Sequence, residues 1–183
     1  MVKIGVAEKD GITIRLLREF LSASGACVRC ITHCRCDNRT METVRADYLL
    51  VPIDMVCPDA RLDLVISVNS ELFTKKMSVK VMLENGDNNY PADDKISCER
   101  RIKFGMSRGC DITASSIGRT DNAMFVSCCV HRRFDGVLGN TADIGEYTFR
   151  IYGSNPPTAC VLGASAAYIM CQNTKKGETL LLY

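Results

Sequence analysis

Tryptophan is absent from this 183-residue sequence, and aromatic residues make up only 7% of it. Aromatic platforms on which nucleic-acid bases could stack are therefore scarce. An excess of charge of one sign is also missing, because 23 basic and 21 acidic residues leave a net charge of +2. Since no run of lysine and arginine occurs either, we expect neither a nucleic acid nor a membrane surface as partner.

Long apolar runs are missing as well. No run approaches the roughly 18 residues of a membrane span, and the residues after Met1 lack a signal-peptide pattern, so we expect a cytoplasmic protein. Internal repeats, low-complexity tracts and a linker long enough to separate two domains are absent too. With 46% hydrophobic residues, the chain is long enough to bury one core, and we expect a single domain over residues 1–183.

Cysteine, in contrast, is abundant, with 11 residues. An odd number in a chain expected to be cytoplasmic favours reduced thiols over a disulfide framework. Cys128 and Cys129 lie in the apolar run 124–130, and Cys160 and Cys171 lie in a helical pattern. We interpret these four as small core residues.

The segment 27–36 contains four cysteines and one histidine. Four of these residues could supply a tetrahedral zinc site, namely Cys30, His33, Cys34 and Cys36. No second ligand pair follows at the spacing of a zinc ribbon, and strand alternation would point Cys27 and Cys30 to opposite faces. We favour a cysteine-rich strand with its exit loop, and keep a metal-binding or redox protein as an alternative.

The pattern of apolar runs predicts an α/β fold with a mostly parallel sheet. Strands are expected at 2–7, 27–32, 48–53, 62–68 and 79–83, an amphipathic helix at 11–24, and short helices at 39–46 and 70–76. From about residue 100 the pattern is typical of antiparallel strands, expected at 102–104, 111–117, 124–130 and 147–152. A helix from Thr158 to Cys171 follows Pro156 and Pro157, and an edge strand is expected within 175–183.

The segment Ile4-Gly-Val-Ala-Glu-Lys-Asp-Gly-Ile-Thr-Ile-Arg-Leu-Leu-Arg18 has the pattern of strand, glycine turn and helix on which nucleotide-binding enzymes carry a phosphate loop. In a working loop of the form G-x-x-G-K-S/T, backbone N–H groups and a lysine hold the phosphates. Here Ile12 replaces the lysine and Glu8 the first glycine. At an effective dielectric near 20, a carboxylate about 5 Å from a phosphate charge repels it by roughly 3 kcal/mol. This repulsion lowers the affinity for the phosphate about a hundredfold. Lys9 or Arg15 could substitute for the lysine in part.

On these residues the chain resembles the central domain of the Mur ligases, ATP-dependent enzymes that add amino acids to peptidoglycan precursors. The resemblance covers nearly the whole chain. Beyond the loop it includes the turn Asn85-Gly-Asp-Asn88, the passage Ile102-Lys-Phe-Gly105 with Cys110-Asp-Ile-Thr-Ala-Ser115, and the helix around 161–167. It implies a three-layer fold of the P-loop type, with a mostly parallel sheet over about 1–100 and a small antiparallel annex with the final helix over about 101–183.

The departures from the family pattern fall on its functional positions. Pro52 stands where the resemblance places a magnesium-binding glutamate, although Asp54 follows two residues later. Asn69 matches an asparagine of the family, but the histidine expected soon after it is missing, and residues around Ala159 and Cys160 replace the pair that helps seat adenine. The family's reaction also needs an N-terminal and a C-terminal domain, for which 183 residues leave no room. These departures indicate a pseudoenzyme.

We therefore expect a non-catalytic binding or regulatory module related to peptidoglycan-precursor or amino-acid ligation pathways, with another protein chain or a Mur-type ligase as partner. Its vestigial phosphate loop comprises Lys9, Asp10, Gly11 and Thr13. No catalytic residue and no cofactor are expected; His131 is interpreted as a solvated strand end. The alternative is one component of an ATP- and magnesium-dependent acid–amino acid ligase, with Lys9, Thr13 and Asp54 as substitute ligands.

Overall fold

The computed structural model describes residues 1–88, 95–153, 155–172 and, as backbone, 179–182. The elements, with 3-10 helices written η, are β1 (Val2–Ala7), α1 (Ile12–Ala23), β2 (Val28–Cys30), α2 (Asn38–Glu42), β3 (Tyr48–Pro52), η1 (Ile53–Met55), β4 (Leu62–Ser67), η2 (Ser70–Leu72), β5 (Met77–Asn85), β6 (Ile96–Gly105), β7 (Ile112–Thr120), β8 (Ala123–Val130), β9 (Phe134–Asp135), β10 (Thr141–Ala142), β11 (Gly145–Tyr152), α3 (Thr158–Cys171) and β12 (Thr179–Leu182).

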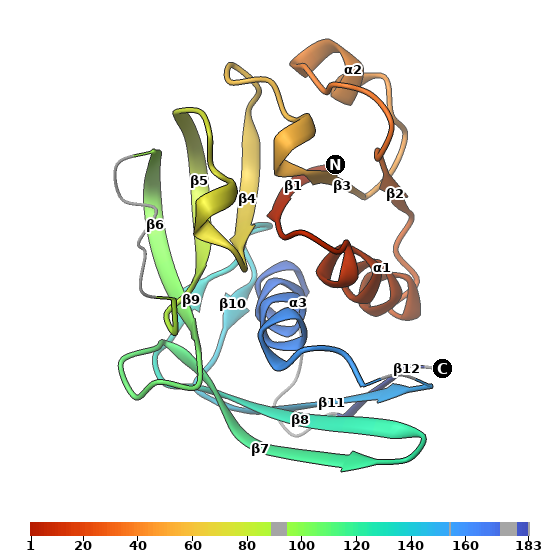
Figure 1. Cartoon of the computed structure of the whole chain (residues 1–183), viewed down its shortest axis with the longest axis vertical. Coiled ribbons are helices and arrows are strands. Elements are labelled where there is room, and N and C mark those ends of the chain that lie inside the picture. The colour runs from red at the N-terminus through yellow and green to blue at the C-terminus, as the bar shows by residue number, and fades with distance from the viewer. Residues whose placement is uncertain (89–94, 154, 173–178, 183) are drawn as a thin grey trace.

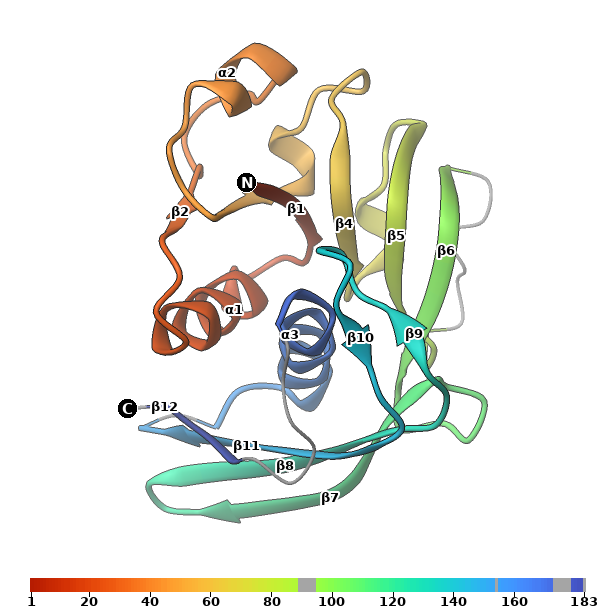
Figure 2. The same ribbon diagram turned by 180° about the vertical axis from the view of Figure 1, so that it is seen from behind.

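Within the described residues, ten strands form one sheet in the order β12-β11-β8-β7-β6-β5-β4-β1-β3-β2. Every neighbouring pair from β2 to β7 is parallel, whereas β8 runs antiparallel to β7 and β11. Strands β9 and β10 form a separate antiparallel pair. Figures 1 and 2 show the sheet curving, so that β7, β8 and β11 lie beneath α3 while β4, β5 and β6 stand beside it.

The parallel strands are covered on both faces, as their continuous apolar runs predict. One core cluster lies between the sheet and the helices α1 and α3; the other, on the opposite face, includes Met41 of α2, Ile53 of η1 and Phe73 after η2. Helices, sheet and a thinner outer layer of short segments therefore make three layers. The predicted three-layer α/β class, with a mostly parallel sheet and an antiparallel part, is confirmed.

The two long helices differ in how much of their surface is covered. Helix α1 buries one face, which carries Ile14, Leu17 and Phe20, and leaves Arg15 and Arg18 exposed. Helix α3 is buried from Cys160 to Cys171, because the curved sheet and α1 surround it. An alanine-rich helix that is apolar on all sides suits this central position. Among the described residues, no helix is long and apolar enough to cross a membrane.

Several expected elements differ from the structure. Strand β6 was expected to begin the antiparallel part, but it pairs parallel with β5 along most of its length. It also joins β7 in parallel through only two residue pairs, at Phe104 and Gly105, so the annex continues the main sheet. Of the short helix expected at 70–76, only the 3-10 turn Ser70–Leu72 forms, and no helix continues over residues 73–76 before β5 begins at Met77. Strand β12 lies at the sheet edge as expected, while residues 175–178 and 183 of that prediction lie outside the described residues.

Candidate functional site

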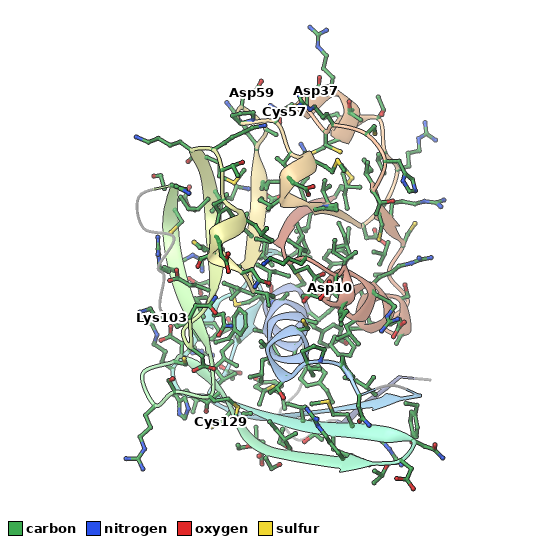
Figure 3. All side chains as sticks on the ribbon, viewed as in Figure 1. Asp10, Asp37, Cys57, Asp59, Lys103 and Cys129 are labelled. Carbon is green, nitrogen blue, oxygen red and sulfur yellow. The ribbon has the colours of Figure 1, made fainter. Side chains whose placement is uncertain are left out.

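The loop between β1 and α1 lies at the carboxyl end of the parallel strands, where Figure 3 labels Asp10. Gly11 immediately precedes the helix with φ of +65°, a left-handed conformation that glycine adopts without strain. The chain can thus turn sharply from the strand into α1, whose first N–H groups face the loop. Lys9 and Asp10 are exposed, and Thr13 is fully buried.

The N-terminus of α1 is capped by the side chain of Glu8. The backbone N–H of Thr13 donates to Glu8 Oε2 at 2.8 Å, and the N–H of Ile14 donates to Oε1 at 2.9 Å. The first N–H groups of a helix are a ready anion site, because they are unpaired within the helix and lie at the positive end of its dipole. Glu8 places an anion of the chain itself there, so a phosphate could bind to these N–H groups only by displacing it.

Cys160, in the first turn of α3, lies beside this loop. Burial raises the pKa of the Cys160 thiol, the neighbouring Thr13 hydroxyl opposes that rise, and the carboxylates of Glu8 and Asp10 add to it. The thiol therefore stays protonated at neutral pH. Thr13 Oγ1 has no partner within hydrogen-bond geometry among the described residues. The helical pattern predicted Cys160 as a core residue, and it is buried in the core around α3. The pattern did not predict that Cys160 also lies beside Thr13 and Glu8.

A pocket of about 440 Å³ opens next to the loop, beyond the carboxyl ends of β1 and β3. Open parallel sheets characteristically bind ligands at this position. The lining residues are Glu8, Lys9, Gly11, Ile14, Pro52, Ile53, Asp54, Met55 and Leu72. Three of them are charged, and the walls are mostly apolar. The structure thus brings Lys9 and Asp54, the substitute ligands of the ligase alternative, to one pocket with Glu8.

The polar residues that follow β4 and β5 bond to one another. The side-chain amide of Asn88 donates to the Val68 carbonyl at 2.8 Å, and that of Asn85 reaches the same carbonyl at 3.5 Å. The backbone N–H of Asn69 donates to the Ala7 carbonyl at 2.9 Å. These bonds tie the turn 85–88 and the loop after β4 to the end of β1. The side chains of Asn85 and Asn88 therefore have a structural role here, whereas Asn69 contributes through its backbone N–H.

The cysteines of segment 27–36 are spread over different surroundings. Cys36 is fully buried, Cys30 is half-buried and Cys34 is exposed. The backbone of Cys36 forms an isolated parallel bridge with that of Val56. Burial raises the pKa of Cys36 to about 11, and nearby Cys34, Cys57 and Asp37 add to the rise; Figure 3 labels Cys57 and Asp37 at this end of the molecule. Across the described part of the chain, no three His, Cys, Asp or Glu side chains are grouped to hold a metal ion. The zinc alternative thus has no support from the geometry.

Comparison with solved structures finds similar folds at low sequence identity. A MurF ligase from Thermotoga maritima, solved in complex with ADP, is 13% identical with a TM-score of 0.52, over 93% of this chain and 44% of that one. The UDP-N-acetylmuramoylalanyl-D-glutamyl-2,6-diaminopimelate–D-alanyl-D-alanyl ligase from Acinetobacter baumannii is 12% identical with a TM-score of 0.59, over 93% and 43%. A murein peptide ligase from Psychrobacter arcticus is 11% identical with a TM-score of 0.53, over 91% and 42%.

The fold of this chain is therefore one that occurs in Mur ligases, and the chain spans less than half the length of these three structures. The resemblance seen in the sequence is confirmed at the level of the fold. No family model and no curated protein matches the chain. At identities of 11–13%, the similarity to these ligases is one of fold. The chemistry of the loop after β1 depends on the residues that this chain carries there.

The residues of the loop do not fit a nucleotide in the observed conformation. The N–H groups at the start of a helix are those that can hold a phosphate, and at α1 Glu8 accepts from the N–H groups of Thr13 and Ile14. Ile12 stands at the position where the phosphate-loop pattern has a lysine. Its uncharged side chain packs partly against the core and cannot neutralise a phosphate. Pro52 ends β3 and has no side-chain oxygen for a magnesium ion.

Proposed function

We propose that this chain is a Mur-ligase-like domain that works without ATP and magnesium, as a binding or regulatory module. The observation that carries the proposal is the position of the Glu8 carboxylate on the N–H groups of Thr13 and Ile14. A phosphate would have to compete with a tethered anion and then lie close to its displaced charge. That repulsion alone is roughly 3 kcal/mol, or about a hundredfold in affinity.

The binding site of the proposed module is the pocket beside the loop. Its volume of about 440 Å³ lies in the range usual for small-molecule sites, and its walls are mostly apolar with a few charged groups. We propose a cytoplasmic role related to peptidoglycan-precursor or amino-acid ligation, with another protein chain or a Mur-type ligase as partner. The similarity to Mur ligases supports the choice of pathway.

An ATP-dependent ligase component is the second candidate. It is favoured by one observation, namely that Lys9 and Asp54 line the same pocket as Glu8. Lys9 is exposed and could turn toward a phosphate, and Asp54 supplies a carboxylate near the end of β3. This candidate requires Glu8 to leave the N-terminus of α1.

Calorimetry with ATP, with and without magnesium, separates the two candidates. We expect no heat of binding for the natural protein and micromolar binding after the double change of Glu8→Gly with Ile12→Lys. The matched control combines Asp10→Gly with Ile12→Lys, which restores the lysine and leaves Glu8 in place, and it should not bind. Micromolar binding by the natural protein would overturn the proposal and make Lys9 and Asp54 the next residues to change.

A further inference from the structure

A second group of reactive side chains lies on the antiparallel part of the sheet, away from the loop after β1. Successive side chains of β8 point to opposite faces, so that Cys128 is fully buried on the face toward α3 and Cys129 is half-buried on the outer face. Figure 3 labels Cys129 on this part of the molecule and Asp10 in the distant loop. The expectation that Cys129 is a core residue was wrong, because the two neighbours point to opposite faces of a strand.

Cys129 faces a histidine that a third residue orients. The Cys129 Sγ lies 3.9 Å from Nδ1 of His131, two residues further along the chain. The other ring nitrogen of His131, Nε2, lies 2.8 Å from the hydroxyl oxygen of Thr113. Thr113 is the residue directly opposite Cys129 in the pairing of β7 with β8. Strand register therefore assembles the three side chains.

The contact with Thr113 fixes the position of the ring and is compatible with the tautomer that a base at Nδ1 requires. When Nε2–H donates to the Thr113 hydroxyl, Nδ1 carries a free electron pair and points toward the thiol. A nucleophile, a base within reach and a group that orients the base form the arrangement by which proteins activate cysteine. A separation of 3.9 Å is long for transfer of a proton, and such contacts commonly shorten when a reaction partner binds.

The charged groups around the pair are largely engaged with other partners. Glu146, opposite Cys129 on β11, accepts a hydrogen bond from the Ser115 hydroxyl. Arg132 pairs with Asp111 at 2.6 Å, and Arg133 pairs with Asp143 at 2.9 Å. These charged side chains therefore bond to partners other than Cys129 and His131.

We propose that Cys129 is a nucleophilic thiol and a site of thiol–disulfide exchange with low-molecular-weight disulfides, with His131 as its base and Thr113 as the residue that positions His131. In this step the Cys129 proton moves to Nδ1 of His131 and the thiolate attacks one sulfur of the disulfide. The new S–S bond joins Cys129 to that sulfur, the old S–S bond breaks, and the departing thiolate takes the proton from His131. One disulfide is exchanged for another without net oxidation, and the open sheet face admits a small disulfide.

The experiment treats the natural protein with oxidised glutathione at pH 7 and follows each cysteine by mass spectrometry of its peptide. Cys27 and Cys34 are exposed free thiols and serve as internal comparison. Exposure alone would make half-buried Cys129 the slowest of the three. We expect Cys129 to react about tenfold faster than Cys27, as activated thiols do.

Three variants test the roles of the neighbours. His131→Ala should slow Cys129 about tenfold while leaving Cys27 unchanged. Thr113→Val should slow Cys129 less and move its pH–rate profile toward that of Cys27, and Thr113→Ser, which keeps the hydroxyl, should restore the natural rate. Circular dichroism and the urea midpoint of each variant check that it is folded. A Cys129 rate below that of Cys27 in the natural protein, or a rate unaffected by His131→Ala in a folded variant, would overturn the proposal.

Discussion

At the scale of single residues, Glu8 has a structural consequence apart from any ligand. Its carboxylate accepts hydrogen bonds from two N–H groups at the start of α1, as a capping side chain does.

We predict that Glu8→Ala lowers the free energy of unfolding by about 1–2 kcal/mol, because both N–H groups lose their partner. Urea denaturation measures the change. Asp10→Ala removes an exposed carboxylate from the same loop and should change stability by less than about 0.5 kcal/mol; equal losses in the two variants would contradict the capping role.

Asp87 holds the turn after β5 through its carboxylate. It accepts from the N–H of Met106 at 2.6 Å and from the N–H of Ser107 at 2.9 Å, and the Ser107 hydroxyl donates to it as well. Burial by itself raises the pKa of Asp87, but the hydrogen bonds from Ser107 and Met106 outweigh it and leave this pKa below its ordinary value.

Because the pKa of Asp87 is lower in the folded chain, its carboxylate contributes stability above the pKa of the unfolded chain, and this contribution is lost as the pH falls through the folded value. We predict that Asp87→Asn lowers the free energy of unfolding at pH 7 by about 1 kcal/mol, the usual size of a capping contribution. The difference between variant and natural protein should shrink toward pH 3. Urea midpoints measured from pH 3 to 7 check it, and a difference that is the same at all pH values would exclude the carboxylate as its cause.

At the scale of elements, three aromatic rings join α1, α3 and β11. Phe20 and Phe149 have ring centroids 5.1 Å apart, and Tyr168 lies 6.0 Å from each of them. Phe20 and Phe149 are among the largest fully buried side chains. The rings therefore connect α1 and α3 with β11 of the antiparallel part. Figure 2 shows β11 beneath α3, with α1 beside α3.

We predict that Phe20→Ala lowers the free energy of unfolding by about 3–5 kcal/mol, because it leaves a cavity where three elements meet. Phe20→Leu keeps most of the volume and should cost less than about 1.5 kcal/mol. Chemical denaturation of both variants gives the comparison. Losses of similar size in the two variants would indicate that the site collapses around the smaller residue, or that the aromatic ring itself carries the stability.

At the scale of the whole molecule, buried cysteines report on whether the chain unfolds as one unit. Cys36 lies in the core cluster on the outer side of the parallel strands, and Cys128 lies in the cluster around α3. Burial raises the pKa of Cys128 to about 12, with the Ser165 hydroxyl opposing the rise and Cys129 and Glu146 adding to it. Neither thiol should react at pH 8 while the chain is folded, because both are buried and protonated.

We predict that Cys36 and Cys128 become reactive to a short pulse of alkylating reagent at the same urea concentration, as expected for a single cooperative domain over residues 1–183. Exposed Cys27 should react at every concentration and serves as the control. Peptide mass spectrometry after the pulse gives the two transitions. Separate midpoints would show that the antiparallel part unfolds independently of the parallel sheet.

Much of the architecture followed from local patterns of the sequence. The apolar runs at 2–7, 48–53 and 62–68 predicted β1, β3 and β4 to within one residue, and the pattern after Pro156 and Pro157 predicted α3 at its observed bounds. Such runs specify elements because a buried strand or helix must be apolar wherever it is covered, and turn residues mark its ends. The position of the candidate site followed too, since the glycine turn after β1 lies at the carboxyl edge of a parallel sheet.

What the tertiary structure decided were contacts between residues far apart in the chain. Local pattern does not specify which strand pairs with which, so the parallel pairing of β6 and the curvature of the sheet around α3 were missed. The approach of Cys160 to the loop after β1 and the alignment of Thr113 opposite Cys129 both depend on packing and register. Apolar runs set which segments are buried, but the distances on which chemistry depends arise only when the segments pack together.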